Sequence, residues 1–450
     1  MVQLAVREPD LYHLKGAQRE LVARTRRSQQ MAADRTEVIN GAMAASGLCP
    51  PPIFIVRNEG ADFEDIDGNV YLDTCMGFGV HVLGHRPKPV EEAIRNQLAR
   101  GWHFSLRGAD QLAYARMIQS AAQGNERVVF CNTGTEATLY AIRAARALTG
   151  KTKIALFDIS YHGAHDTVLI WPAPGSTADR LLPMSLGHGI PESVMSDVLL
   201  LPYRHSAALD AMAAHADELA AVLVEPVQGS RPEADVGGFL SELRKLCDGL
   251  NLILIFDEVL TGFRLAYGGA QERYGIASDI TTYGKAAGGG LPIGVIAGRK
   301  KLMEAFGDFT APRGIFFGGT FSGNPLSISA GLSTLQHLHS NPGVFSRIDR
   351  LTVRLTDEFN SYCAQNGHAA RVISCGSMWQ IFFRDEALSD FDYKGKEAEG
   401  AFYLHCLNQG VFIHATHRCY LSAAHTDKDV DRLITVFKSA LHLVRADGLD

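Results

Sequence analysis

Between residues 77 and 330 the sequence alternates short apolar runs with patterns typical of amphipathic helices. The clearest runs are residues 127–130, 153–157, 220–224, 252–256 and 295–297. Runs rich in Val, Ile and Leu without polar alternation indicate strands that are buried on both faces of a parallel sheet. We therefore predict an α/β fold in which helices cover a mostly parallel sheet. Right-handed connections would place the carboxyl ends of the strands, and with them a ligand site, along one edge.

The segments on either side of this region predict a second, smaller domain. Residues 53–72 have the pattern of a small antiparallel sheet with a hairpin turn at Asp67-Gly68-Asn69. Residues 344–450 mix helical and strand patterns and end in an amphipathic helix. We predict three segments: an N-terminal helix and small-domain hairpin in residues 1–76, a large ligand-binding domain in residues 77–330, and the C-terminal part of the small domain in residues 331–450.

Composition favours a soluble, globular protein in the cytoplasm. The chain has 450 residues, of which 46% are hydrophobic, and this is enough for a core spread over two or three lobes. A net charge of −6 is not the footprint of a protein that binds nucleic acid or an anionic membrane. No apolar run is long enough to span a bilayer, and residues 1–10 lack the apolar segment of a signal peptide.

The cysteines and histidines do not predict a metal site. The eight cysteines are scattered and form no C-x-x-C pair, which suits a reducing compartment and argues against zinc. His414, His417 and His425 lie close together in sequence and could be metal ligands, but structural histidines are the more common interpretation of such a set. We predict no bound metal.

Lys285 is the residue that most directly suggests chemistry. It stands in a glycine-rich segment, Tyr283-Gly284-Lys285-Ala286-Ala287-Gly288, so that a planar ligand could approach it closely. Asp257 ends the apolar run at residues 252–256, where a buried strand would deliver a functional side chain. An amine nucleophile and a carboxylate partner for a ring nitrogen are what Schiff-base chemistry on pyridoxal phosphate requires. The alternative for Lys285 is an ordinary surface turn.

Four further motifs follow strand candidates or precede helices, at residues 131–137, 161–163, 224–228 and 318–325. In the first, Gly134 and Thr135 would offer free amides and a hydroxyl at a helix N-terminus, which is a site for an anion. The last could donate to a phosphate in the same way. An aromatic ring at Tyr161 could stack on a planar cofactor. Each motif taken alone also fits a plain helix cap or a core side chain.

Taken in order, these motifs resemble those of the class III, fold type I pyridoxal phosphate-dependent aminotransferases. The resemblance covers about residues 53–440 and is greatest to the branch that holds glutamate-1-semialdehyde aminomutase and its aminotransferase relatives. It implies a large domain with a mostly parallel, seven-stranded-type sheet between helices, and a small α+β domain from both termini. It also implies pyridoxal phosphate as cofactor and a homodimer with shared active sites. The matching pieces are Asn132-Thr133-Gly134-Thr135-Glu136-Ala137, Tyr161-His162-Gly163, Glu225-Pro226, Phe256-Asp257-Glu258-Val259, Tyr283-Gly284-Lys285, Gly319-Thr320-Phe321-Ser322-Gly323-Asn324-Pro325 and Ala424-His425-Thr426-Asp427.

The resemblance implies catalytic roles for three residues. Lys285 would form the Schiff base with the cofactor and would later move a proton. Asp257 would pair with the pyridinium nitrogen and keep it protonated, which makes the ring an electron sink. Tyr161 would cover one face of the ring, and Val259 would cover the other.

The remaining cofactor and substrate contacts come from the other matching positions. Gly134 and Thr135 would bind the phosphate, and Thr320 would reach the phosphate of the neighbouring subunit. His162 would belong to the cofactor site. Gln228 would lie near the phenolic oxygen of the ring, and Glu225 would line the substrate pocket.

One departure from the family pattern bears on the substrate. The aminomutase branch carries a substrate-anchoring arginine in a Ser-Pro-Val-Arg segment, whereas residues 44–52 of this chain contain no arginine. The anchor for the substrate carboxylate is therefore lost or moved, which points to a different substrate. Arg418 is the leading candidate for a moved anchor and Arg107 the weaker one. Either arginine could instead form a surface salt bridge.

We predict an aminotransferase that moves an amino group by ping-pong chemistry from a donor, L-glutamate, to a small-molecule carbonyl acceptor. The acceptor would lack a standard α-carboxylate and could be an amino-sugar or aminoglycoside-type ketone or aldehyde of secondary metabolism, as in antibiotic biosynthesis. The alternatives are an aminomutase of the glutamate-1-semialdehyde type or an epimerase, and a β-amino acid aminotransferase that relies on Arg418. A non-catalytic scaffold on the same fold is disfavoured by the intact Lys285 and Asp257.

Overall fold

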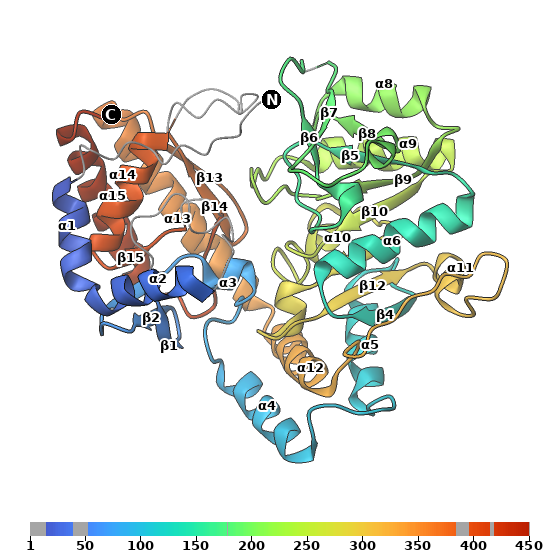
Figure 1. The fold of residues 1–450 in the computed structure, drawn as a ribbon, viewed down its shortest axis with the longest axis horizontal. Coiled ribbons are helices and arrows are strands. Elements are labelled where there is room, and N and C mark those ends of the chain that lie inside the picture. The colour runs from blue at the N-terminus through green and yellow to red at the C-terminus, as the bar shows by residue number, and fades with distance from the viewer. Residues whose placement is uncertain (1–14, 39–52, 178, 384–395, 415–417, 450) are drawn as a thin grey trace. The chain divides into compact units, whose positions relative to one another are not determined.

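The computed structural model describes residues 15–38, 53–177, 179–383, 396–414 and 418–449. The chain divides into two compact units, each described by itself (Figure 1). The first unit takes residues up to Pro87 and residues from Ser346 onward, and the second takes Lys88–Phe345. The first unit is therefore built from both ends of the chain.

A seven-stranded sheet forms the centre of the second unit, with the strand order β4-β12-β11-β10-β9-β5-β8. Its strands are β4 (Arg127–Cys131), β5 (Lys153–Phe157), β8 (Val198–Leu201), β9 (Leu219–Val224), β10 (Ile253–Asp257), β11 (Ile280–Tyr283) and β12 (Gly294–Gly298). All neighbouring strands are parallel except β12, which runs antiparallel to both β11 and β4. The predicted mostly parallel sheet is confirmed.

Helices and short strands surround this sheet. The helices are α4 (Lys88–Arg100), α5 (Asp110–Ala121), α6 (Gly134–Thr149), α7 (Glu192–Ser196), α8 (Ser206–Ala214), α9 (Gly237–Leu250), α10 (Gly269–Tyr274), α11 (Lys300–Met303) and α12 (Pro325–Ser340). Short 3-10 helices lie at η3 (Asp166–Val168), η4 (Lys285–Gly288) and η5 (Glu304–Phe306), and β6 (Ile170–Pro172) pairs with β7 (Pro183–Ser185). Helix α6 packs across β9, β11 and β12 (Figure 1).

Apolar burial explains why these runs form central strands. Every residue of β9 and of β10 is buried, so neither strand has a solvent face and neither shows polar alternation. Leu223 and Ile255 sit in the core beneath α6, together with Ala141 of that helix. Full burial of one such Leu or Ile side chain stabilises the fold by about 1.5–3 kcal/mol. The strands and α6 therefore form a rigid base for the loops at the strand ends.

The first unit contains two small sheets, one ordered β1-β2-β3-β15 and one ordered β13-β14-β16. The strands are β1 (Ile55–Glu59), β2 (Asp62–Asp65), β3 (Val70–Asp73), β13 (Arg371–Cys375), β14 (Met378–Phe382), β15 (Val411–Phe412) and β16 (Cys419–Tyr420). The helices are α1 (Lys15–Arg24), α2 (Arg26–Val38), α3 (Met76–Gly79), α13 (Gly343–Asn366), α14 (Lys396–Asn408) and α15 (Asp427–Ala446). The antiparallel pairing of β1, β2 and β3 confirms the predicted small sheet.

The turn between β2 and β3 shows why this hairpin forms. Gly68 adopts φ 86°, a left-handed conformation that favours glycine. The Asp65 carboxylate accepts hydrogen bonds from the backbone N–H of Asp67 at 3.0 Å and of Asn69 at 2.8 Å. The turn residues therefore satisfy the local backbone, as the sequence signal predicts.

The described part of the chain contains free cysteines but neither a metal-binding cluster nor a membrane-spanning helix. The cysteines that it contains are all buried free thiols, and burial raises the pKa of Cys75 to about 12. Cys49 and His417 lie outside the described residues. Within the described ranges there is no cluster of three or more His, Cys, Asp or Glu suited to a metal ion. None of the described helices is long and apolar enough to cross a membrane.

Candidate active site

The candidate residues of the second unit gather at the carboxyl ends of neighbouring strands. Strand β9 lies between β10 and β5 in the sheet. Asp257 ends β10, Glu225 follows β9 directly, and Tyr161 lies in the loop after β5. Since the three strands are parallel, their ends meet at one edge of the sheet. The structure thus brings Asp257, Glu225 and Tyr161 to the same edge of the sheet.

Asp257 is the best-defined group at this edge, with only 3% of its surface exposed. Its Oδ2 lies 2.7 Å from Nδ1 of His162, which is equally buried. Its Oδ1 accepts hydrogen bonds from the Val259 backbone N–H and from Thr282 Oγ1, both at 3.1 Å. Hydrogen bonds from donors favour the ionised carboxylate. The side chain is therefore held in one orientation by three contacts.

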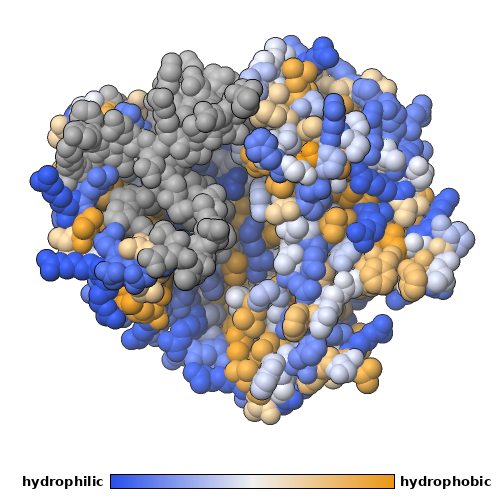
Figure 2. All heavy atoms as spheres, viewed as in Figure 1, coloured by the Kyte–Doolittle hydropathy of each residue, from blue (hydrophilic) through white to orange (hydrophobic). Residues whose placement is uncertain are grey.

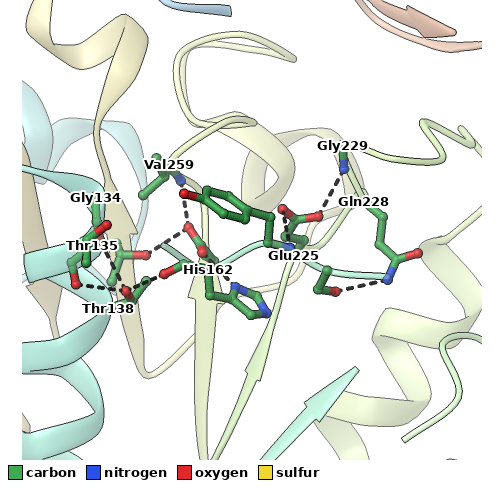
Figure 3. Close-up of polar contacts among 12 residues, drawn as sticks. Gly134, Thr135, Thr138, His162, Glu225, Gln228, Gly229 and Val259 are labelled. Carbon is green, nitrogen blue, oxygen red and sulfur yellow. Dashed lines mark hydrogen bonds and ion pairs between the residues drawn. The ribbon is translucent and has the colours of Figure 1, made fainter. Parts of the chain in front are cut away.

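One ring nitrogen of His162 has a hydrogen-bond partner, and the other has none among the described residues. To donate to the ionised Asp257, a neutral His162 must carry its proton on Nδ1. Its Nε2 is buried and has no hydrogen-bond partner among the described residues. The ring position is also set through the backbone, because Thr138 Oγ1 donates to the His162 carbonyl at 2.6 Å (Figure 3).

The N-terminus of α6 leaves two amides unpaired. The Thr133 hydroxyl accepts from Glu136 N–H at 3.0 Å, and the Glu136 carboxylate accepts in return from Thr133 N–H at 3.1 Å. This capping box satisfies the neighbouring donors. The backbone N–H groups of Gly134 and Thr135 have no acceptor in the described part of the chain. Two free amides at the positive end of a helix form a site for an anion such as phosphate.

Glycines allow three loops to meet around this helix end. A Cβ atom on Gly134 would lie 2.9 Å from Val259 Cγ1, and one on Gly163 would lie 2.7 Å from the Thr135 Cα. Gly163 also has φ +105°, which a side chain would strain. The Thr135 hydroxyl in turn accepts from Ala164 N–H at 3.2 Å. The glycines of the motifs are therefore needed for close approach of the backbone.

Lys285 follows the strand next to that of Asp257. It begins η4 immediately after Gly284 and is partly exposed, with φ 45°. A left-handed conformation costs a non-glycine residue about 1–2 kcal/mol and is commonly stored at functional sites. The buried Tyr283 anchors the preceding strand, because its hydroxyl accepts from Asn125 Nδ2 at 2.9 Å.

Glu225 and Gln228 tie the loops after β5 and β9 together (Figure 3). The Glu225 carboxylate accepts from the backbone N–H of Tyr161 at 3.4 Å and of Gly229 at 3.0 Å. Gln228 donates through Nε2 to Ser160 Oγ at 2.9 Å. The Tyr161 ring itself is half exposed, at 50%. Tyr161 is anchored through its backbone and half exposed, so its ring can cover a flat ligand.

The other candidate residues have less defined surroundings. Thr320 is exposed on the turn that precedes α12. Arg107 is exposed before α5. Arg418 belongs to the first unit, directly before β16. Residues 44–52, the segment that lacks the family arginine, lie outside the described residues.

The sequence analysis missed three residues of this site. Thr282 lies opposite Asp257 in the parallel register of β11 and β10, and Thr138 lies one helical turn after Gly134. His165 is partly buried next to Thr138, and burial lowers the pKa of its imidazole to about 4. The i, i+4 spacing from Gly134 could have identified Thr138. Nothing local in the sequence indicates Thr282.

Comparisons with known proteins agree with the geometry. The sequence model of the family described as "Aminotransferase class-III" matches residues 43–441. The chain is 37% identical over 430 residues to the glutamate-1-semialdehyde 2,1-aminomutase of Archaeoglobus fulgidus. The matched region covers 92% of this chain and 99% of the relative. It resembles a solved transaminase with PLP bound at 28% identity and a TM-score of 0.85, over 94% and 99% of the two chains. It resembles the β-phenylalanine aminotransferase of Variovorax paradoxus at 28% identity and a TM-score of 0.83, over 97% and 98%.

Proposed function

The chain belongs to the class-III aminotransferase family, a fold type I group that uses pyridoxal phosphate, and on this premise we propose that it is an aminomutase-type enzyme. The proposed reaction exchanges an amino group and a carbonyl between neighbouring carbon atoms of a small amino aldehyde or ketone. The curated relative named as an aminomutase supports this reaction type over the aminotransferase reaction first expected. The buried Asp257 carboxylate, held by three donors, carries the proposal.

The residues present fit pyridoxal phosphate. The two free amides of Gly134 and Thr135 suit its phosphate, and the glycine at position 163 leaves the room that a side chain would fill. The Asp257 anion suits its ring nitrogen. When bound, this cofactor supplies an electron sink for the carbon that loses a proton.

The protein groups then bind, orient and move protons. We assign to Lys285 Nζ the attachment of the cofactor and the movement of a proton between the reacting substrate carbon and the cofactor. Asp257 keeps the ring nitrogen protonated, and His162 orients Asp257. Tyr161 and Val259 would cover the two faces of the ring. Gln228 would lie near its phenolic oxygen, and Glu225 would line the substrate pocket.

Stoichiometry tests the proposal. An aminomutase needs no second substrate, so the holoenzyme should convert glutamate-1-semialdehyde or a related amino aldehyde completely to the isomer with exchanged groups. Product is measured by chromatography after incubation with a large excess of substrate over enzyme. A reaction that stops after one equivalent per active site would contradict an aminomutase. Lys285→Ala is the control, and turnover by this variant would contradict the role given to Lys285.

An aminotransferase is the second candidate, because two of the similar solved structures are described as transaminases. The absence of arginine from residues 44–52 also fits a substrate other than glutamate-1-semialdehyde. In this case L-glutamate alone should release one equivalent of 2-oxoglutarate, and turnover should continue only after a carbonyl acceptor is added. A β-amino acid substrate anchored by Arg418 is one version of this candidate. No comparison supports the amino-sugar acceptor or a role in antibiotic biosynthesis.

A homodimer is part of the proposal. The second unit exposes large apolar side chains in two segments, and exposed apolar patches mark association surfaces. Hydrophobic atoms are visible on the surface in Figure 2. In a homodimer these segments would be covered by the second copy, and Thr320 would reach the partner's cofactor phosphate. The exposed side chains are Trp102, Leu106, Leu112, Phe309, Phe316 and Phe321.

A further inference from the structure

Three loops at the carboxyl ends of β5, β8 and β9 are joined beside the candidate active site. The Tyr203 backbone N–H donates to Asp158 Oδ1 at 2.8 Å, and the Tyr203 hydroxyl donates to the Pro226 carbonyl at 2.7 Å. Ser230 Oγ donates to the Ile159 carbonyl at 2.7 Å. The loops therefore form one hydrogen-bonded platform.

Two residues of this platform have unfavourable backbone conformations. Ile159 has φ 57° and Arg204 has φ 61°. Such values are rare for a β-branched residue and uncommon for any residue other than Gly, Asn or Asp. Strain of this kind persists only where the surroundings enforce it, and it clusters at ligand sites. The position of the Arg204 side chain is therefore maintained against a local cost.

Two arginines of the platform converge on one carboxylate. Arg231 Nε donates to Glu233 Oε1 at 2.5 Å, and Arg204 Nη1 donates to Glu233 Oε2. These side chains are only 29%, 32% and 20% exposed for Arg231, Arg204 and Glu233 respectively. Asp235 is the other acid near Arg204, and its Oδ2 lies 3.8 Å from Arg204 Nη2. The Asp235 side chain is fully exposed, so solvent screens this ion pair. Within the described ranges the terminal amino groups of Arg231 form no hydrogen bond or ion pair. Burial raises the pKa of the nearby Asp158 carboxyl, and the positive charge of Arg231 acts against this effect of burial.

Arg231 lies close to the proposed cofactor site along the same loop. Gln228, three residues earlier, bonds to Ser160, which precedes Tyr161. The loop follows β9, the direct neighbour of the strand that ends in Asp257. Neighbouring strands are about 4.8 Å apart. Arg231 and Asp257 therefore lie on loops at the same edge of the sheet, after neighbouring strands.

We propose that Arg231 binds an anionic group of the substrate, a carboxylate or a phosphate, and that Arg204 and Glu233 hold Arg231 in place. A guanidinium with free terminal amino groups pairs with either anion through two parallel hydrogen bonds. This inference rests on the proposed function only in requiring that a substrate amine reacts at the cofactor.

Spectral titration of the holoenzyme tests the site. The cofactor absorption is followed while adding straight-chain ω-amino acids of increasing length, the matching O-phosphorylated amino alcohols, and alkylamines that lack the anion. At one chain length the anion should tighten binding roughly 10- to 100-fold over the alkylamine. Comparison of the first two series distinguishes a carboxylate from a phosphate.

Variants assign the effect to Arg231. Arg231→Gln should remove the advantage of the anion and leave the dissociation constants of the alkylamines unchanged. Glu233→Gln removes the carboxylate that pairs with both arginines, so the advantage of the anion over the alkylamine should increase. A merely structural salt bridge would not produce this increase. Arg299→Gln is the matched control, because Arg299 pairs with Asp279 beyond the other end of β11.

Two results would overturn the anion site: no advantage of an anion at any length, or an advantage that persists in Arg231→Gln. A cofactor absorption that no amine changes would overturn the proposed function and this site together. Amine binding without an anion effect would leave the proposed function standing and remove only the site.

Discussion

Asp257 shows how a single carboxylate is prepared by residues far away in sequence. His162, Thr282 and the Val259 amide all donate to it, so both oxygens are occupied before any ligand arrives. A preorganised anion costs little reorganisation when charge develops at a neighbouring ring nitrogen. We therefore expect Asp257 to contribute to catalysis more than to folding.

We expect Asp257→Asn to lower kcat by roughly 100-fold or more, because the neutral amide no longer stabilises a protonated ring nitrogen. Steady-state kinetics measure kcat, and thermal unfolding followed by circular dichroism measures the stability of the variant. Asp279→Asn is the control, since Asp279 is also buried but pairs with Arg244 and Arg299. That control should lose stability and keep kcat. A kcat that is unchanged in Asp257→Asn would contradict the proposed role.

Glu258, the next residue, is a buried acid whose pKa is raised. It is fully buried, and desolvation raises the pKa of its carboxyl to about 7 despite hydrogen bonds from Ala270 N–H, Gln271 N–H and the Thr261 hydroxyl. Between the ordinary value of 4.5 and about 7 the unfolded chain has lost this proton while the folded chain retains it. Stability must therefore fall as the pH rises through this window.

We expect the contribution of Glu258 to stability to decrease by about 3 kcal/mol between pH 4.5 and 7, since one pKa unit corresponds to about 1.4 kcal/mol. Denaturant unfolding of the wild type and of Glu258→Gln at pH 5 and pH 8 measures the change. Because Gln does not titrate, the variant should gain stability relative to the wild type at the higher pH. A difference between the two proteins that is independent of pH would refute the raised pKa.

At the level of elements, the N-terminus of α6 depends on the loop that follows β5. Gly163, in the loop after β5, lies so close to Thr135 that a side chain there would clash. The position of this loop therefore affects whether the amides of Gly134 and Thr135 can face a phosphate. The apolar runs of β9, β10 and β12 were predicted correctly, because each is continuous. Strand β11 is not predicted from the sequence, because Ile-Thr-Thr-Tyr is half polar. Its two threonines are buried, and their hydroxyl groups form hydrogen bonds with Ser278 and Asp257.

We expect Gly163→Ala to weaken retention of the cofactor and to lower stability by about 1–3 kcal/mol, because its Cβ would clash with Thr135 at a positive φ. Gly150→Ala is the matched control. Gly150 also has a positive φ, +72°, at the end of α6, but its Cβ would meet nothing within 4 Å. The control should show only the backbone strain and retain the cofactor, as measured by absorption after gel filtration. Equal loss from both variants would mean that the clash has no effect.

At the level of the whole molecule, the second unit carries large apolar side chains that are exposed. Leu106 is 86% exposed and Leu112 is 62% exposed, which is unusual for large aliphatic side chains that cluster in one segment. We propose that the second copy of the chain covers them. Phe321, the neighbour of Thr320, is also exposed, and in the proposed dimer Thr320 would reach the partner's cofactor phosphate.

We expect the protein to sediment as a dimer, and Leu106→Asp combined with Leu112→Asp to convert it to a monomer with lower activity. Sedimentation velocity and activity at matched concentration check this result. Val353→Asp is the control, because Val353 is 47% exposed on α13 in the first unit. A wild-type protein that sediments as a monomer would refute the assembly, and with it the role of Thr320.

Local sequence signals predict several of the elements, and the family motifs predict the cofactor. Continuous apolar runs and turn residues act locally, so the positions of β9, β10 and the hairpin at Gly68 follow from neighbouring residues. The motifs around Asp257 and Lys285 likewise identified the family and the cofactor. Tertiary structure decided the direction of β12, the pairing of His162 with Asp257 across 95 residues, and the convergence of Arg204 and Arg231 on Glu233. These depend on strand register and on packing between distant segments, which no local propensity specifies.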